Sequence, residues 1–237
     1  MLCGASGRMG RAVRAELEGS GKFALAAAID AKPGPGVEPP DAFGYQLGAA
    51  DVVLDFSSPE AACGYAAACA RAGKPFVTGV TGLTVRQLPS LKAAARRIPV
   101  FVSPNMSPAV NLTFALAAAA ARSLAGFDAH VSEAHHSAKR DAPSGTALRY
   151  AECVAEARGG AVPPITSIRA GDITGDHTVL FAGPYERIEI THRAHSRAVF
   201  AAGALKAAAW TAGRKPGFYD YMDLLGLRGP AGMKGKI

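Results

Sequence analysis

The segment SEAHHSAKRDAPSGTA, residues 132 to 147, gathers residue types that can transfer a proton to an anionic substrate. His135 is suited to release a proton near neutral pH, and Lys139 supplies a positive charge or a second proton. Ser144 fits the N-cap of a helix, whose first backbone N–H groups would favour an anion. Each feature alone is more often structural than functional. Together they predict a proton donor beside a site for a negative group.

Strand periodicity would separate the two adjacent histidines of this segment. If residues 130–136 form a strand, Val131, Glu133 and His135 share one face, whereas His136 lies on the other. The two histidine side chains therefore face different surroundings.

A glycine-rich turn, GASGRMG, opens the chain and precedes a helical pattern. Gly4, Gly7 and Gly10 form GxxGxxG, which by itself is a weak signal for a dinucleotide site. The next predicted strand ends in Asp30, where an acid can hydrogen-bond an adenosine ribose. The pattern thus favours a dinucleotide turn over a glycine-rich helix start without a ligand. Since three residues precede Gly4, we expect the first strand to be very short or the sequence to begin inside it.

Residues up to about 108 alternate between short apolar runs and amphipathic segments. Strands are predicted at 23–30, 51–58, 74–80 and 99–105, with helices at 8–19, 59–73 and 85–97. Alternating strands and helices indicate an α/β class with a Rossmann-like parallel sheet.

From about residue 109 the pattern changes to a second, α+β domain with a mixed sheet. Helices are predicted at 109–121 and 146–159, and a short one at the end of 214–227. Strand-like segments are 129–136, 165–172, 177–183, 186–194 and 198–210.

Composition and charge limit the kinds of partner that this chain is expected to bind. The 237 residues carry a net charge of +7, but the basic residues are scattered, which argues for a small anionic ligand and against nucleic acid. The longest apolar run is too short to span a bilayer, so no membrane partner is predicted. The four cysteines form no CxxC pair, and in a strand His192 and His195 would point to opposite faces, so no metal site is predicted. Reduced thiols favour a cytoplasmic location.

The chain resembles the 4-hydroxy-tetrahydrodipicolinate reductase family, also called dihydrodipicolinate reductase, of lysine and diaminopimelate biosynthesis. The family signature is Glu, Ile or Val, any, Glu, any, His, three of any, Lys, any, Asp, any, Pro-Ser-Gly-Thr-Ala, and this chain matches it from Val131 onward in HVSEAHHSAKRDAPSGTA. The segments GASGRMGR, VLDFSSPEA, VTGVTGL and RAGDITGDHT extend the resemblance over nearly the whole chain.

The resemblance implies roles for matching residues. His135 would be the proton donor and Lys139 its partner in acid catalysis or carboxylate binding. Residues implied to bind the substrate are His136, Ser144, Gly145 and Thr146. Residues implied to bind the cofactor are Gly4, Ala5, Ser6, Gly7, Arg8, Met9, Asp30, Gly79, Val80, Thr81, Ser103, Pro104, Asn105 and Met106.

The resemblance also implies NADH or NADPH as cofactor, a small dicarboxylate substrate and a homotetramer. The acid at Asp30 would repel a ribose 2′-phosphate, which favours NADH even though Lys32 lies close. The implied domains are 1–108 with 206–237 for the dinucleotide, and 109–205 for the substrate and for tetramerisation.

Four departures from the family pattern stand out. His130 replaces a glutamate, on the strand face opposite His135, and Val80 replaces a common threonine. Ala31 stands where an arginine is frequent, which further favours NADH, and the stretch 159–167 is shorter than usual. A weakened relative that binds the dinucleotide as a sensor or structural oligomer is the alternative function.

Overall fold

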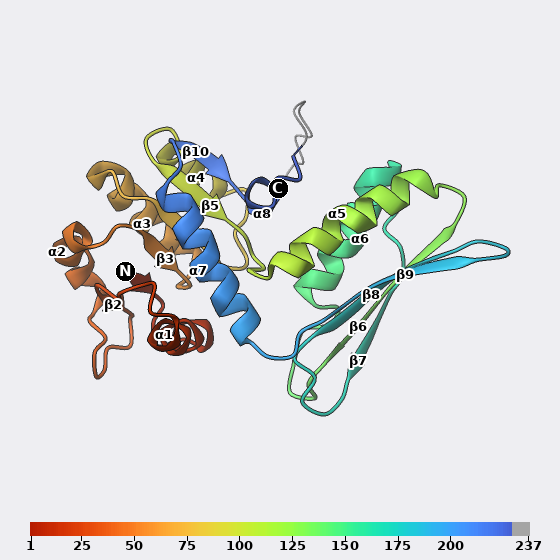
Figure 1. Cartoon of the computed structure of the whole chain (residues 1–237), viewed down its shortest axis with the longest axis horizontal. Helices are drawn as coiled ribbons and strands as arrows, with labels where there is room; N and C mark the ends of the chain where they lie inside the picture. The colour runs from red at the N-terminus through yellow and green to blue at the C-terminus, as the bar shows by residue number, and fades with distance from the viewer. Residues whose placement is uncertain (229–237) are drawn as a thin grey trace. The chain divides into compact units, whose positions relative to one another are not determined.

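The computed structural model describes residues 1–228, which fall into two compact units. The first comprises Met1–Ser107 together with the chain from Ala198 onward, and the second is Pro108–Arg197. The chain therefore leaves the first unit once and returns to it (Figure 1).

The first unit contains a parallel sheet of six strands in the order β10-β5-β4-β3-β1-β2, as the α/β prediction required. Its strands are β1 (Leu2–Cys3), β2 (Ala28–Ile29), β3 (Val53–Asp55), β4 (Phe76–Thr78), β5 (Pro99–Val102) and β10 (Gly217–Tyr219). Its helices are α1 (Arg8–Ser20), α2 (Phe43–Gln46), α3 (Pro59–Ala72), α4 (Leu88–Ala94), α7 (Ala198–Ala212) and α8 (Tyr221–Leu224), with 3-10 turns at Pro40–Ala42 and Leu47–Ala49.

Strand β1 has two residues, which confirms the expected very short first strand. Leu2 and Cys3 are buried and pair with both β2 and β3, so they occupy the middle of the sheet. The amino group of Met1 donates to the carbonyl of Val52, 3.0 Å away, and extends this pairing by one residue.

Apolar residues cover both faces of this sheet, as parallel sheets require. Val100 on β5 packs with the α3 and α4 side, and the next residue, Phe101, packs with the α7 side. Helices α1 and α7 contact each other, and α3 contacts α4 (Figure 1). Because side chains alternate between the two faces of a strand, β5 contributes to the hydrophobic core on each side of the sheet.

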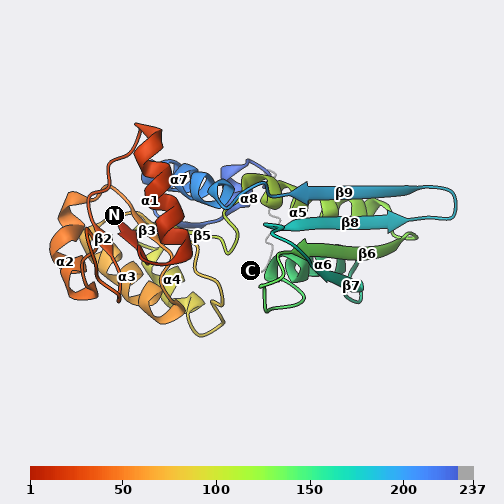
Figure 2. The ribbon, with the colours of Figure 1, turned by 90° about the horizontal axis from the view of Figure 1, so that it is seen from below.

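The second unit is a four-stranded mixed sheet in the order β7-β6-β8-β9, with two helices on one face (Figure 2). Its strands are β6 (Asp128–His135), β7 (Ile165–Arg169), β8 (Asp176–Ala182) and β9 (Arg187–Arg193), and its helices are α5 (Pro108–Ser123) and α6 (Gly145–Arg158). Strand β6 is parallel to β7 and antiparallel to β8.

Four features of the structure differ from the sequence predictions. The strand-like segment 198–210 is the helix α7, because a long alanine-rich run that buries one broad face and exposes the other suits a helix packed on a sheet. The first unit consequently resumes at residue 198, whereas the family resemblance implied its return at 206. Within 214–227 the strand β10 was missed, because its three residues gain strand geometry only by pairing with β5. His195 lies beyond the end of β9, so it has no strand face to share with His192.

Candidate functional site

The glycine-rich turn links β1 to α1, and its spacing has a steric cause. Gly4 has a φ of 73°, and a Cβ on it would lie 2.4 Å from the carbonyl oxygen of Phe56. A Cβ on Gly10 would lie 2.1 Å from the carbonyl oxygen of Gly4. Only glycine at these two positions lets α1 begin directly against the strand ends.

The start of α1 is suited to an anion. Gly7 is the N-cap and offers no side-chain cap, and the first turn of the helix holds no acidic residue. Arg11 Nη1 donates a hydrogen bond to the carbonyl oxygen of Ser6, 2.5 Å away, and this bond places a guanidinium beside the turn. Backbone N–H groups at the positive end of a helix dipole, with an arginine beside them, fit a pyrophosphate.

Asp30 fixes this turn from the end of β2. Its Oδ2 accepts the backbone N–H of Ser6 at 2.9 Å, and its Oδ1 accepts that of Lys32 at 2.8 Å. The hydroxyl of Ser6 donates to the carbonyl oxygen of Lys32 at 2.9 Å. A carboxylate keeps further lone pairs for hydroxyl donors, so these contacts fit the role in ribose binding that the sequence predicts for Asp30.

The turn after β4 is tied to a buried carboxylate that the sequence reasoning did not assign to the site. Thr78 donates its hydroxyl to Asp55 Oδ2 at 3.0 Å and accepts the backbone N–H of Val80 at 3.2 Å. The Oδ1 of Asp55 accepts both the backbone N–H and the hydroxyl of Ser57. Burial raises the pKa of Asp55 to about 6, and the hydrogen bonds from Ser57 and Thr78 oppose that rise.

The segment after β5 is held by local hydrogen bonds. The hydroxyl of Ser103 donates to the carbonyl oxygen of Asn105 at 2.7 Å, and the Oδ1 of Asn105 accepts the backbone N–H of Ser107 at 2.9 Å. The hydroxyl of Tyr221 donates to the carbonyl oxygen of Met106 at 2.8 Å. These bonds fix the backbone of the last predicted cofactor segment.

In the second unit, β6 follows the predicted alternation. Val131, Glu133 and His135 are buried on one face, and His130 lies on the other, 2.9 Å from the hydroxyl of Thr166. His135 Nδ1 lies 2.5 Å from Glu133 Oε2, within one strand and two residues apart. Glu133 is 2% exposed and His135 is 8% exposed.

The strands beside β6 add two charged or titratable groups to this face. Arg169 on β7 makes two hydrogen bonds to the two oxygens of Glu133, at 2.9 and 2.7 Å. His177 on β8 pairs with Glu133 in the sheet register, and its ring stands 5.1 Å from that of His135, centroid to centroid. The sequence reasoning had assigned neither residue to the site.

Helix α6 begins beside this cluster. Ser144 caps the helix by accepting the backbone N–H of Ala147, and its hydroxyl oxygen lies 3.1 Å from His177 Nε2. The backbone N–H of Ser144 points to Glu133 Oε1 at 3.3 Å. The N-cap role that the sequence predicted for Ser144 is therefore confirmed, and Gly145 and Thr146 form the first turn of the helix.

Lys139 lies in the loop between β6 and α6. Its ammonium group bonds both carboxylate oxygens of Asp141, at 2.8 and 2.7 Å. His136 anchors the start of the same loop, because its backbone N–H donates to Ile173 at 2.7 Å and its ring Nε2 lies 3.4 Å from an Arg197 guanidinium nitrogen.

Electrostatics set different protonation states within the cluster. Burial would raise the pKa of Glu133, but hydrogen bonds from Arg169, Ser167 and His135 outweigh it and hold that pKa at about 2. Burial lowers the pKa of His135 below its ordinary value, while Glu133 opposes that change. Burial, with a smaller contribution from His135, lowers the pKa of His177 to about 3. Near neutral pH the cluster therefore holds an anionic Glu133 and a neutral His177.

Among the predicted residues, the structure joins the glycine turn to Asp30 in the first unit, and in the second it joins His135 to the N-cap Ser144 through Glu133. Glu133, Arg169 and His177 were missed because strand pairing, not sequence proximity, places them near His135. For Glu133 the sequence did contain a signal, because the alternation of side chains along a strand places Glu133 on the same face as His135.

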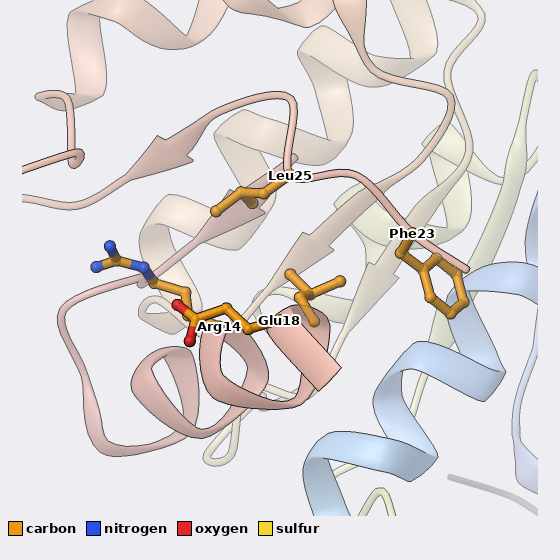
Figure 3. Close-up of a pocket in the computed structure, with 5 residues that line it drawn as sticks. Arg14, Glu18, Phe23 and Leu25 are labelled. Carbon is orange, nitrogen blue, oxygen red and sulfur yellow. The ribbon is translucent and has the colours of Figure 1, made fainter. Parts of the chain in front are cut away.

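A separate shallow pocket of about 210 Å³ lies along the C-terminal half of α1. Its lining comprises Arg14, Leu17, Glu18, Phe23 and Leu25 (Figure 3). None of these is a predicted site residue, and the glycine turn lies at the other end of α1. In the part of the chain that the structure describes, no helix has the length and apolar character needed to cross a membrane.

Known proteins match this chain over nearly its whole length. Residues 1–106 match the family model described as dihydrodipicolinate reductase, N-terminus, and residues 109–225 match dihydrodipicolinate reductase, C-terminus. A relative from Anaeromyxobacter dehalogenans, named 4-hydroxy-tetrahydrodipicolinate reductase, is 43% identical over 97% of this chain and 98% of its own. A relative of the same name from Thiobacillus denitrificans is 44% identical over 96% of this chain and 98% of its own.

A solved structure supports the fold. Dihydrodipicolinate reductase from Paenisporosarcina sp. TG-14, with dipicolinate bound, superposes with a TM-score of 0.80 at 23% identity and covers 94% of this chain and 97% of its own. With both family models matched and relatives above 40% identity along nearly the full length, this chain belongs to the dihydrodipicolinate reductase family.

Proposed function

We propose that this chain reduces 4-hydroxy-tetrahydrodipicolinate to tetrahydrodipicolinate with NADH or NADPH, in lysine and diaminopimelate biosynthesis. The relatives named for this reaction support the assignment, and their two family models account for both units. The single observation that carries it is the buried pair of Glu133 and His135 beside Lys139 and the start of α6.

The proposed chemistry has two parts. The substrate loses its 4-hydroxyl group as water, and the unsaturated ring that results would take a hydride from a bound reduced nicotinamide while His135 gives a proton to the neighbouring position. His136, Lys139 and the helix start at Ser144, Gly145 and Thr146 hold the carboxylates of a small dicarboxylate. The charge of Lys139 and the dipole of α6 both favour that dianion.

The proposed cofactor residues lie in the first unit. The glycine turn from Gly4 to Met9 would hold the pyrophosphate, and Asp30 the ribose. Gly79, Val80 and Thr81 would lie near the nicotinamide, with the segment from Ser103 to Met106 completing the site. The carboxylate of Asp30, next to Ala31, supports a preference for NADH, because it repels a 2′-phosphate.

We further propose that the first unit is the dinucleotide domain and the second the substrate and tetramerisation domain. In the second unit, residues 108–197 place no helix on the sheet face that carries Ile168, which is 50% exposed, and the half-buried Leu180. An uncovered sheet face with apolar side chains supports association of four copies through it. The free cysteines and the use of NAD(P)H support a cytoplasmic enzyme.

One assay tests the function. Purified protein should oxidise NADH when the product of dihydrodipicolinate synthase is supplied, and should not do so in its absence. Wild-type protein that binds NADH but gives no substrate-dependent oxidation contradicts the proposal. Light scattering after gel filtration measures the tetramer independently of this assay.

A further inference from the structure

Glu133 is the most fully bonded carboxylate of the second unit. It is 2% exposed, and besides the Ser167 side chain three groups from different parts of the chain lie within hydrogen-bonding distance of it. His135 Nδ1 lies at 2.5 Å, two Arg169 nitrogens lie at 2.9 and 2.7 Å, and the backbone N–H of Ser144 lies at 3.3 Å. Buried carboxylates are rare unless paired, so this one holds a specific arrangement in place.

Arg169 bonds both oxygens of this carboxylate, including the Oε2 that lies against His135. It comes from β7, whose parallel pairing with β6 sets Arg169 opposite His135. Its guanidinium also donates to the carbonyl oxygens of Ile168 at 2.7 Å and Asp141 at 2.6 Å. The Arg169 guanidinium is thus held by two backbone carbonyl groups while it bonds both oxygens of Glu133. Because the planar guanidinium matches the two carboxylate oxygens, this arrangement fixes the orientation of the Glu133 carboxylate.

We propose that Glu133 is a positioning residue for His135, which keeps the ring proton on Nδ1 and leaves Nε2 as the nitrogen that exchanges the catalytic proton. Arg169 holds Glu133 in place and ionised. The inference deepens the proposed function and rests on it, because that function makes His135 the proton donor.

The surroundings of the other ring nitrogen agree with this assignment. A Cβ on Gly175 would lie 3.0 Å from His135 Nε2, so the absence of a side chain there keeps this nitrogen uncrowded. The ring of His177 stands at 77° to that of His135 and bonds Ser144 through its own Nε2. Glu133 therefore bonds Nδ1 alone. The other ring nitrogen of His135, Nε2, faces space that the Cβ of an alanine at position 175 would narrow.

Charges on every side of His135 determine the effect of losing Glu133. Glu133 on β6 is the one anion among them, while Lys139 of the loop and Arg169 of β7 are cations. His177 on β8 is neutral near pH 7, because burial holds its pKa at about 3. Without the carboxylate, burial and two cations act on His135 unopposed, so its pKa falls further below the ordinary value.

A test on wild-type protein requires no activity. Nitrogen NMR of the full-length protein with labelled histidine, assigned with His135→Gln, reports which ring nitrogen carries the proton. We expect the neutral ring of His135 to carry it on Nδ1. A neutral ring with its proton on Nε2 overturns the proposal.

Variants then separate positioning from simple support of the sheet. Glu133→Gln should lower the pKa of His135 and reduce kcat about 10- to 1,000-fold with little change in KM, and Glu133→Asp should restore part of the rate. Glu156→Gln is the matched control, since Glu156 pairs with Arg149 on the exposed side of α6 and makes no contact with His135. It should leave His135 and kcat unchanged.

A purely structural role predicts a different pattern. Folded Glu133→Gln protein in which His135 keeps its wild-type tautomer, pKa and kcat would overturn the proposal. If Glu133→Gln does not fold, Arg169→Gln replaces it, and an unchanged His135 spectrum and kcat in that variant would count equally against the inference. Loss of the proposed function instead appears as wild-type protein without turnover, while the NMR result still decides the tautomer.

Discussion

The ammonium group of Lys139 lies 2.8 and 2.7 Å from the two carboxylate oxygens of Asp141, two residues along the same loop. Before Lys139 can bond a substrate carboxylate, it has to leave or share this partner. The hydrogen bond from Lys139 is also the largest influence that lowers the pKa of Asp141. In the proposed function, Asp141 would therefore compete with the substrate for Lys139.

Lys139→Met removes this cation. We expect KM for the substrate to rise about 10- to 100-fold, because a charge-assisted hydrogen bond to a carboxylate contributes about 1.5–3 kcal/mol. Calorimetry with dipicolinate should show a similar loss of affinity. Asp141→Asn keeps the ammonium and should not raise KM. Lower kcat with unchanged KM and affinity would assign Lys139 to proton transfer.

His135→Gln should abolish the proposed proton transfer while leaving the substrate contacts. The expected fall in kcat is about 100- to 10,000-fold with a small change in KM, the range typical of a general acid. His130→Gln is a suitable control, because His130 lies on the opposite face of β6 and bonds Thr166. Equal kinetic effects of the two substitutions would refute the assignment.

Asp30→Asn should shift the cofactor preference. The loss of a charged acceptor should weaken NADH binding by about 10-fold, since hydrogen bonds to charged groups contribute about 1.5–3 kcal/mol. NADPH should lose less affinity, because the repulsion of its 2′-phosphate is removed as well. Fluorescence titration with each cofactor measures the ratio. A parallel loss for both cofactors would show that Asp30 acts only by holding the turn through Ser6 and Lys32.

Two glycines of α1 form a matched pair for stability. Gly10→Ala should lower the melting temperature and weaken NADH binding, because its Cβ would lie 2.1 Å from the carbonyl oxygen of Gly4. A Cβ on Gly19 meets no atom within 4 Å, so Gly19→Ala should raise stability by about 0.5–1 kcal/mol. Similar melting temperatures for both variants would contradict the close packing of the turn.

Asp55 should give the protein a pH-dependent loss of stability. Burial raises its pKa from 3.8 to about 6, so the folded state binds this proton more tightly than the unfolded state. The stabilisation of the folded state by protonated Asp55 is complete below about pH 3.8 and is lost as pH rises through about 6. Relative to Asp55→Asn, wild-type protein should lose about 3 kcal/mol of unfolding free energy across this window.

Urea unfolding of both proteins at several pH values measures that difference. The comparison isolates Asp55, because carboxylates with lowered pKa values, such as Glu133, titrate in both proteins. A difference in unfolding free energy that stays constant from pH 4 to pH 7 would contradict the raised pKa.

Local signals in the sequence determined much of the candidate site. The residues from His135 to Thr146 are close in sequence, so the N-cap at Ser144 and the loop carrying Lys139 could be predicted from residue types alone. The glycine spacing and the period of two along β6 are likewise local, because they reflect backbone sterics and strand geometry. The parallel sheet followed from alternation of apolar strands with amphipathic helices.

Only the tertiary structure decided which residues meet across strands. Arg169 lies 36 residues from Glu133, and their pairing depends on the register of β6 and β7. The alanine-rich run 198–210 looked strand-like but is a helix, because packing against a sheet and α1 stabilises it. The sequence by itself determined the chemistry offered by His135 and Lys139, whereas long-range pairing decided which groups surround His135, because the buried carboxylate beside it is held by a distant arginine.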